Sequence, residues 1–119
     1  MTVLEAIHEF DTRTPNSYSQ DQKVRWLDRL DSFIRSEILR RYPLQKVDLV
    51  GLGDVNRQLL MGTPYEEAYV LWLQSKVHYF NEETDRYNGA VRRFRACFED
   101  YQRSLARENQ PEHPGTFRF

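Results

Sequence analysis

The chain has 119 residues, 39% of them hydrophobic, and a formal net charge of −1, which fits one soluble domain with one modest core. The charge balance excludes an overall basic field for holding a nucleic acid backbone. No apolar run approaches the roughly 20 residues that span a bilayer, and the N-terminus lacks the pattern of a signal peptide. A single cysteine excludes an intrachain disulfide. We therefore expect synthesis in the cytoplasm.

Aromatic residues make up 13% of the chain, which is the unusual feature of its composition. Large aromatic side chains fill cores, and they are also enriched at protein–protein interfaces. Composition alone leaves both roles open.

The first half of the chain contains two helix starts. Thr2 and Glu5 form a capping box ahead of a short first helix, and Ser19 with Gln22 caps a second, longer helix. Pro43 ends this second helix. Helical spacing predicts its buried stripe: Trp26, Leu27, Leu30, Phe33, Ile34 and Ile38.

Acidic and basic residues four positions apart are expected to form ion pairs on the outer face of the second helix. These pairs are Asp21–Arg25 and Asp31–Arg35.

Residues 43–62 lack a helical pattern, and a structureless connection of this length is uncommon inside a compact domain. Residues 46–50 alternate weakly between polar and apolar, Gly51 and Gly53 supply a turn, and residues 57–61 are compatible with a second short strand. The sequence predicts either a small hairpin or an extended arm here.

A third helix is predicted to start at Thr63 as the cap, with Pro64 at the first helical position and Glu66 three residues after the cap. Its apolar residues occupy more than one face, so we expect other elements to surround it. They are Tyr65, Ala68, Tyr69, Trp72, Leu73, Val77, Tyr79 and Phe80.

A fourth helix follows a break at residues 81–84, where Asn81 or Thr84 is a candidate cap. Its apolar stripe has heptad spacing, which suits either a coiled coil or packing within a bundle. The stripe consists of Tyr87, Val91, Phe94, Phe98, Tyr101 and Leu105. Arg92, Glu99, Arg103 and Arg107 fall on the opposite face.

Together these patterns predict an all-α fold: a small bundle of about four helices, with a short extended or hairpin segment between the second and third. We assign residues 1–109 to this helical domain and residues 110–119 to a C-terminal tail, which two prolines and a glycine keep from continuing the helix. Residues from three stripes should be largely buried: Trp26, Leu30, Trp72, Leu73, Phe94 and Phe98.

No cluster of residues suited to catalysis or metal binding is apparent. His8 and His78 each have a nearby glutamate but lack the further ligands that a metal needs. The glycines around Leu52 are not followed by the residues of a phosphate-binding loop. Cys97 has no evident histidine partner, so a structural thiol is favoured over a nucleophile. We therefore predict no enzymatic activity, no cofactor and no metal.

Two stretches resemble the small head–tail connector proteins (neck, or head-completion, proteins) of long-tailed phages and prophages. The first is Thr-Pro-Asn-Ser-Tyr-Ser-Gln-Asp-Gln-Lys-Val-Arg-Trp-Leu-Asp-Arg-Leu-Asp at residues 14–31. The second is Leu-Leu-Met-Gly-Thr-Pro-Tyr-Glu-Glu-Ala-Tyr at residues 59–69, continuing through Asn-Glu-Glu-Thr-Asp-Arg-Tyr-Asn at residues 81–88 to Phe94. They cover roughly half of the chain in the family's order. Residues 51–55 and the arginines of the fourth helix have no counterpart in the family pattern.

The resemblance implies a structural subunit that forms a homo-oligomeric ring under the portal, extends the DNA channel and docks a stopper or tail-completion protein. DNA would pass without sequence recognition, no membrane would be involved, and the isolated subunit could be a monomer. The protein would reside in the host cytoplasm during assembly and then in the virion neck. Candidate interface residues lie in the middle segment, the fourth helix and the tail: Leu49, Val50, Leu59, Leu60, Met61, Arg92, Arg103, Arg107, Phe117 and Phe119.

Phe117 and Phe119 are expected to dock in an apolar groove of a neighbouring subunit or ring, and the alternative is a frayed end or a fold back onto the same chain. As a whole, the protein has one main alternative role, a small helical nucleic-acid-binding regulator of phage origin. That role needs a basic recognition helix, and 17 Lys and Arg against 18 Asp and Glu argue against it. A metal-binding four-helix bundle would need paired Glu-x-x-His motifs, which the sequence lacks.

Overall fold

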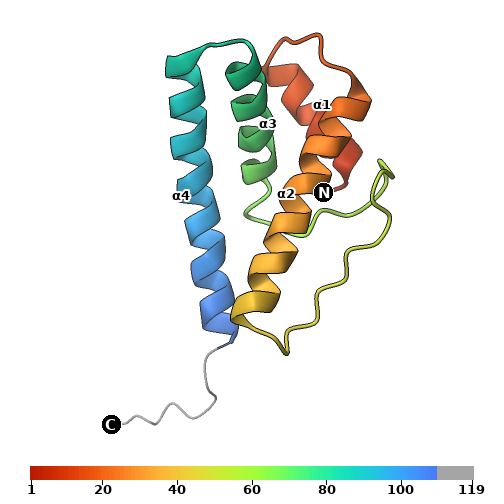
Figure 1. Ribbon diagram of the computed structural model, residues 1–119, viewed down its shortest axis with the longest axis vertical. Coiled ribbons are helices and arrows are strands. Elements are labelled where there is room, and N and C mark those ends of the chain that lie inside the picture. The colour runs from red at the N-terminus through yellow and green to blue at the C-terminus, as the bar shows by residue number, and fades with distance from the viewer. Residues whose placement is uncertain (110–119) are drawn as a thin grey trace.

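The computed structural model describes residues 1–109, whose regular structure consists of four α-helices (Figure 1). They are α1 (Val3–Arg13), α2 (Gln20–Arg41), α3 (Glu67–Phe80) and α4 (Thr84–Glu108). The prediction of a small all-α bundle is confirmed. The hairpin considered for residues 43–62 is absent from the described part of the chain, where the only β-type pairing is an isolated bridge between Thr2 and Gln58.

The first two helix starts are confirmed. The Thr2 hydroxyl accepts a hydrogen bond from the Glu5 amide at 3.2 Å, and the Glu5 carboxylate accepts one from the Thr2 amide at 2.7 Å. The Ser19 hydroxyl accepts from the Gln22 amide at 3.1 Å. Each cap supplies a partner to a backbone N–H that the helix itself cannot satisfy.

The predicted cap at Thr63 is wrong, because α3 begins at Glu67, three residues after the predicted first helical position, Pro64. Residues 63–66 form turns, in which the Tyr65 amide donates to the Gly62 carbonyl at 2.8 Å. The Thr63 hydroxyl donates to the Glu66 carboxylate at 3.2 Å and caps no backbone amide. The turns place Thr63 one full turn before the helix, beyond the reach of its first amides.

Neither candidate cap of the fourth helix holds that position. Asn81 ends α3, and Glu83, which makes no side-chain capping bond, precedes α4. The Asn81 side chain instead accepts a hydrogen bond from the Tyr18 hydroxyl at 2.9 Å, so it ties the loop between α3 and α4 to the start of α2.

Helix α3 packs against each of the other three helices, as its many-sided apolar pattern predicts. Within the described residues, α2 and α4 have no Cα atoms within 8 Å of each other. Figure 1 shows them on either side of α3, well separated near the α3–α4 loop and close together at their C-terminal ends. The core therefore lies between α1, α2 and α3, and α4 is covered mainly by α3.

This arrangement explains which predicted core residues are buried. Trp26, Leu30 and Leu73 are buried as expected. The other three predicted core residues are only partly buried, because most of α4 lacks a second helix to cover its stripe: Trp72, Phe94 and Phe98. Phe33 is exposed, contrary to its assignment to the buried stripe of α2.

No helix within residues 1–109 is both long enough and apolar enough to cross a membrane.

Candidate interaction surfaces

An open hollow lies over α3 and the first half of α4, with a volume of about 490 Å³. It is mostly lined by aromatic and aliphatic side chains, with two cations at its edge. The lining residues are Trp72, Ser75, Lys76, Tyr79, Tyr87, Val91, Phe94 and Arg95.

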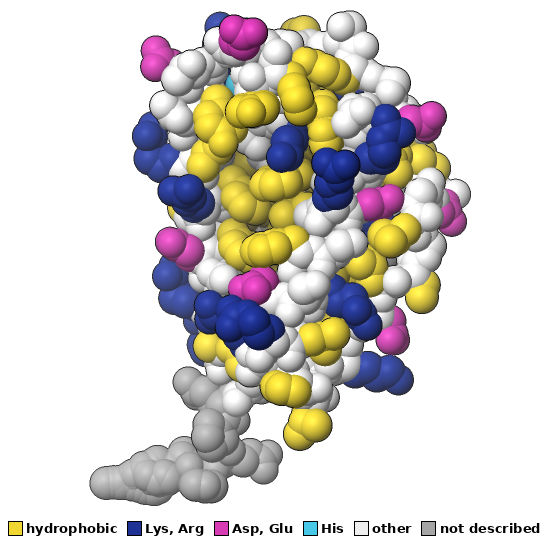
Figure 2. All heavy atoms as spheres, viewed as in Figure 1, with side chains coloured by type: hydrophobic (Ala, Val, Ile, Leu, Met, Phe, Trp, Pro, Cys, Tyr) yellow, Lys and Arg dark blue, Asp and Glu magenta, His cyan; other side chains and the backbone are white. Residues whose placement is uncertain are grey.

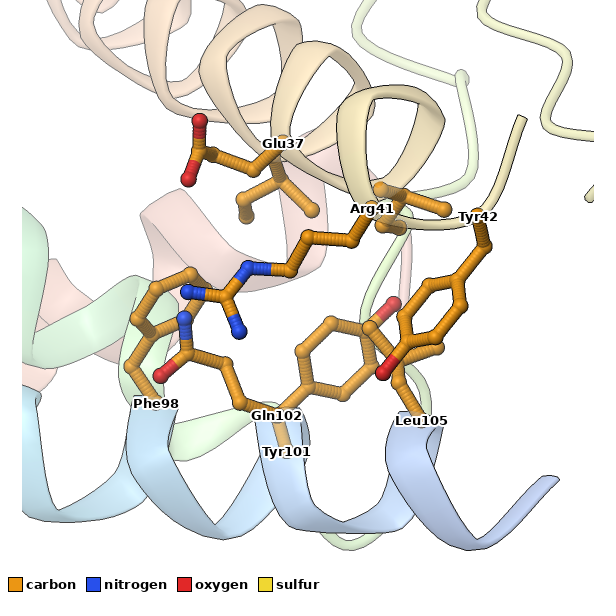
Figure 3. Close-up of a pocket in the computed structure, with 9 residues that line it drawn as sticks. Glu37, Arg41, Tyr42, Phe98, Tyr101, Gln102 and Leu105 are labelled. Carbon is orange, nitrogen blue, oxygen red and sulfur yellow. The ribbon is translucent and has the colours of Figure 1, made fainter. Parts of the chain in front are cut away.

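A second, much smaller hollow of about 20 Å³ lies where the C-terminal ends of α2 and α4 approach each other (Figure 3). The α2 side and the residue after it contribute Ile34, Glu37, Ile38, Arg41 and Tyr42, and α4 contributes Phe98, Tyr101, Gln102 and Leu105. Figure 3 shows Arg41 extending from α2 toward Phe98 and Gln102 of α4.

A row of rings joins the two hollows. Trp72 and Phe94 have centroids 5.3 Å apart, Phe94 and Phe98 are stacked at 5.7 Å, and Phe98 and Tyr101 at 6.3 Å. We call the two hollows and this row of rings the aromatic groove. Figure 2 shows hydrophobic side chains gathered in the middle of this face, with Lys and Arg side chains on both sides of them. The groove therefore accounts for much of the aromatic content.

Three large hydrophobic side chains on α2 and α3 are exposed: Tyr79, which lines the aromatic groove, Phe80 next to it in the chain, and Phe33, one helical turn before the lining residue Glu37. We call them the rim of the groove. Phe80 stacks on Trp26 at 5.9 Å, and Tyr79 contacts Phe80 at 5.2 Å. Phe33 shares a face of α2 with Trp26 and Glu37, because residues 26, 33 and 37 are separated by seven and four positions. The rim thus extends from the α3–α4 loop along α2.

The charges beside the aromatic groove are mainly positive. The Lys76 ammonium lies 4.4 Å from the centroid of the Trp72 ring, a cation–π distance. Burial, with the nearby Arg29, lowers the pKa of Lys76. Within residues 1–109, Lys76, Arg41 and Arg95 form no salt bridge. The acidic lining residue, Glu37, is paired with Arg40 at 3.0 Å.

A second apolar surface lies on the connection between α2 and α3. Leu44 is 99% exposed, Val50 77% and Leu52 54%. The backbone around them is held on α2 at two points: Arg35 donates to the Val47 carbonyl at 3.0 Å, and the Gly53 amide donates to an Asp28 carboxylate oxygen at 2.8 Å. We call residues 44–54 the connection tip.

Two glycines shape this tip. Gly51 has φ of +78° and Gly53 of +90°, in the left-handed region that side chains disfavour. The Asp54 amide donates to the Gly51 carbonyl at 2.9 Å and closes a turn between them. The turn leaves the side chain of Leu52 exposed.

A buried ionic network centred on Asp31 fixes the rest of the connection to α2. The Asp31 carboxylate is fully buried and accepts hydrogen bonds from Arg57 at 2.7 Å, the Tyr69 hydroxyl at 2.5 Å and the Leu60 amide at 3.1 Å. The predicted outer pair Asp31–Arg35 is therefore wrong, because Asp31 faces the core and Arg57 reaches it there. The predicted pair Asp21–Arg25 is also absent from the described residues, where Arg25 instead donates to Gln22 at 2.8 Å.

Arg57 links this network to the connection tip. It also donates to the Asp28 carboxylate at 2.9 Å, and Asp28 in turn holds the Gly53 amide. Burial disfavours the charged guanidinium, but its bonds to Asp31 and Asp28 outweigh that effect and raise the pKa of Arg57. Its Nε has no partner within the described residues. Burial and the Asp31 charge raise the pKa of Tyr69 well above its ordinary value.

The predicted interface residues of the connection differ in how far they are exposed. Val50 is exposed, while Leu49 and Leu60 are partly buried. Leu59 and Met61 are buried in the core, so their assignment to an interface is wrong. The Asp31–Leu60 bond fixes the backbone so that both neighbours of Leu60 face inward.

The predicted interface arginines of α4, Arg92, Arg103 and Arg107, are exposed. Arg103 pairs with Asp100, and Arg92 lines a separate hollow next to α1. The structure does not bring these arginines together with the connection tip. Phe117 and Phe119, which complete the predicted set, lie outside the described residues.

Among the described residues, His78 and Cys97 each have a local hydrogen-bond partner. His78 lies 2.8 Å from the Glu83 carboxylate, and this bond lowers the pKa of Glu83. The Cys97 thiol is half-buried, and burial raises its pKa, so the reactive thiolate is disfavoured. Within residues 1–109, no three potential metal ligands come together.

No protein-family model, curated protein or solved structure matches the chain. The residues and the fold therefore carry the functional argument. They define an all-α bundle with an aromatic groove, an apolar connection tip and a buried ionic network between them.

Proposed function

We propose that this protein is a structural subunit of the head–tail connector of a long-tailed phage or prophage. Copies of the chain would form a ring under the portal protein, extend the DNA channel and dock a stopper or tail-completion protein. The observation that carries the proposal is the presence of two separate apolar surfaces, the aromatic groove and the connection tip, on one small domain. Contiguous exposed apolar surface typically marks sites of protein association.

The two stretches that resemble connector proteins also contact each other in this fold. Asp31, at the end of the first stretch, accepts hydrogen bonds from Leu60 and Tyr69 of the second. Tyr18 of the first stretch donates to Asn81 of the second at 2.9 Å. The resembling residues thus include several that hold this bundle together.

Assembly would take place in the host cytoplasm, and the subunit would then remain in the virion neck. DNA would pass through the ring without sequence recognition, as expected for a chain with nearly balanced charge.

The direct test is cryo-electron microscopy of particles produced by the parent phage or prophage. We expect a ring of this chain at the portal vertex, between the portal and the tail. A complete neck that contains no copy of the chain would overturn the proposal. Particles from a strain lacking the gene provide the matched control, and they should carry DNA-filled heads without attached tails.

The nucleic-acid-binding alternative is favoured by one observation, a hollow of about 520 Å³ with a mainly cationic lining at the start of α4. Arg86, Arg92 and Arg93 contribute to it, and Asp85 is its acidic member. Fluorescence anisotropy with duplex DNA at several salt concentrations tests this role, since neutralising phosphates makes affinity fall steeply with salt. Tight, salt-dependent binding that Arg92→Ser and Arg93→Ser both weaken would favour the regulator over the connector.

A further inference from the structure

The exposed large hydrophobic side chains within residues 1–109 fall into two groups. One group is on the rim of the aromatic groove, and the other is on the connection tip. The six residues are Phe33, Tyr79 and Phe80 in the first group and Leu44, Val50 and Leu52 in the second.

The two groups lie on different sides of the molecule. Figure 1 shows the connection running along the side of α2 that faces away from α4. The bonds from Arg35 to Val47 and from Gly53 to Asp28 hold it on that side. Residues 45–48 meet the C-terminal end of the groove in a hollow that Tyr101 and Leu105 also line, but the exposed side chains of Leu44, Val50 and Leu52 do not line that hollow. These three side chains are left for another molecule to cover.

We propose that the connection tip of one copy docks in the aromatic groove of the next copy, in a head-to-tail contact. This deepens the proposed function, because it names the two surfaces that join neighbouring subunits of the ring. A two-fold symmetric contact that pairs like groups leaves the other group uncovered, and one in which each tip enters the partner's groove needs both groups on the same side of the molecule. A head-to-tail contact covers both groups and leaves one free tip and one free groove for further copies.

The charges of the two surfaces are complementary. The groove has Arg41, Lys76 and Arg95 in its lining. The tip carries Asp48, Asp54 and Lys46, all exposed and in no salt bridge within residues 1–109, so its net charge is −1. A carboxylate placed beside a partly buried ammonium favours its charged form. Complementary charge also steers encounter and disfavours wrong pairings.

The tip is also shaped in advance for binding. Its backbone is anchored to α2 on both sides of Val50, and the Gly51–Asp54 turn fixes the backbone around Leu52. A preformed loop loses less conformational freedom on docking than a free segment does. The small size of the tip suits a weak contact between individual subunits, which ring closure or a portal template then reinforces.

The test measures self-association of the full chain by sedimentation velocity from about 10 μM to about 1 mM, a range that detects weak contacts. The tip variant carries Val50→Ser and Leu52→Ser, and the groove variant carries Tyr79→Ser and Phe80→Ser. All four side chains are more than half exposed, so both variants should fold. Glu99→Ser, on the exposed face of α4, is the matched control.

We expect the wild type and the control to self-associate, and each double variant alone to associate at least about tenfold more weakly. An equimolar mixture of the two variants should form a dimer that grows no further, because each mixed pair has one intact tip and one intact groove. Undiminished association of the tip variant alone would overturn the proposal, since the groove would then bind some other surface. Loss of association in a 1–109 truncation, with the tip variant unaffected, would identify residues 110–119 as the occupant instead.

Failure of this contact and failure of the proposed function give different results. A chain that stays monomeric to about 1 mM overturns the tip-in-groove contact, and the position of the chain at the portal vertex remains a separate question for cryo-electron microscopy. A chain that self-associates as described but is absent from particles overturns the connector proposal and leaves the contact standing.

Discussion

Replacing Asp31 by alanine should destabilise the protein by about 3–5 kcal/mol, the usual cost of removing one partner of a buried ion pair. Asp31 is fully buried and accepts three hydrogen bonds, from Arg57, Tyr69 and Leu60. The substitution leaves the buried guanidinium with Asp28 as its one carboxylate partner and leaves the Leu60 amide without its acceptor. Since small domains are stable by about 5–15 kcal/mol, this loss is a third or more of the total in many cases.

Urea unfolding, followed by helical circular dichroism and tryptophan fluorescence, measures the effect. The matched control is a double variant, Asp31→Leu with Arg57→Met, which replaces the whole pair by apolar side chains of similar volume. The double variant should cost much less than the two single changes added together. It removes both charges of the pair, whereas each single change leaves one of them buried without its partner. A loss below about 1 kcal/mol for Asp31→Ala, or simple additivity in the double variant, would refute the view that this pair is buried and coupled.

Other predictions concern helix caps, alkaline stability and the tail. Ser19→Ala should lower the free energy of unfolding by about 0.5–2 kcal/mol, whereas Thr63→Ala, which removes no cap, should change it by less than about 0.5 kcal/mol in the same urea titration. Stability should fall as the pH rises above about 10, where unfolded tyrosine loses its proton while burial and Asp31 keep Tyr69 protonated in the folded state. Chemical denaturation between pH 8 and 11 should show a shallower fall for Tyr69→Phe, and an identical slope would contradict this. Deleting residues 110–119 should leave the melting temperature nearly unchanged and reduce incorporation into particles, and normal head–tail joining by the truncated protein would exclude an assembly role for the tail.

Local patterns in the sequence were sufficient to predict where the first two helices start. The caps at Thr2 and Ser19 involve residues at most three positions apart, so the pattern contains the whole interaction. Thr63 belongs to the same kind of capping pattern, but a tertiary contact determines the backbone conformation around it. The Met61 amide donates to the Tyr69 hydroxyl at 2.8 Å and anchors the chain ahead of α3, so turns take the place of a first helical turn.

One feature of the sequence indicates the ionic network, but the predictions above did not use it. Asp31 lies four residues after Leu27 and three before Ile34, which puts an acidic residue in the middle of an apolar stripe. A charge at such a position is either a break in the stripe or a buried group with a partner. The partner, Arg57, lies 26 residues away across an irregular connection, and no local pattern indicates that distance.

The aromatic groove shows a different limit of sequence reasoning. The heptad spacing identifies the face of α4 that turns toward the bundle from Phe94 to Leu105, but it passes over Ala90, which is fully buried. It does not say how much of that face another helix covers. Coverage depends on the angle between α2 and α4, which approach each other at the hollow lined by Tyr101 and Leu105 and are well separated near the α3–α4 loop.

The same helix, α2, supports both proposed docking surfaces. Its Trp26 side supports the rim of the aromatic groove, and Asp28 and Arg35 hold the connection tip. Asp31 lies between these anchors and binds Arg57, which fixes the remainder of the connection. One rigid helix therefore sets the position of the tip relative to the groove. A head-to-tail contact closes into a ring of defined size only when that relation is fixed, since a mobile tip would permit open chains as well. The buried network, which reaches the connection tip through Asp28, is thus the part of the fold that would make the proposed closed ring geometrically possible.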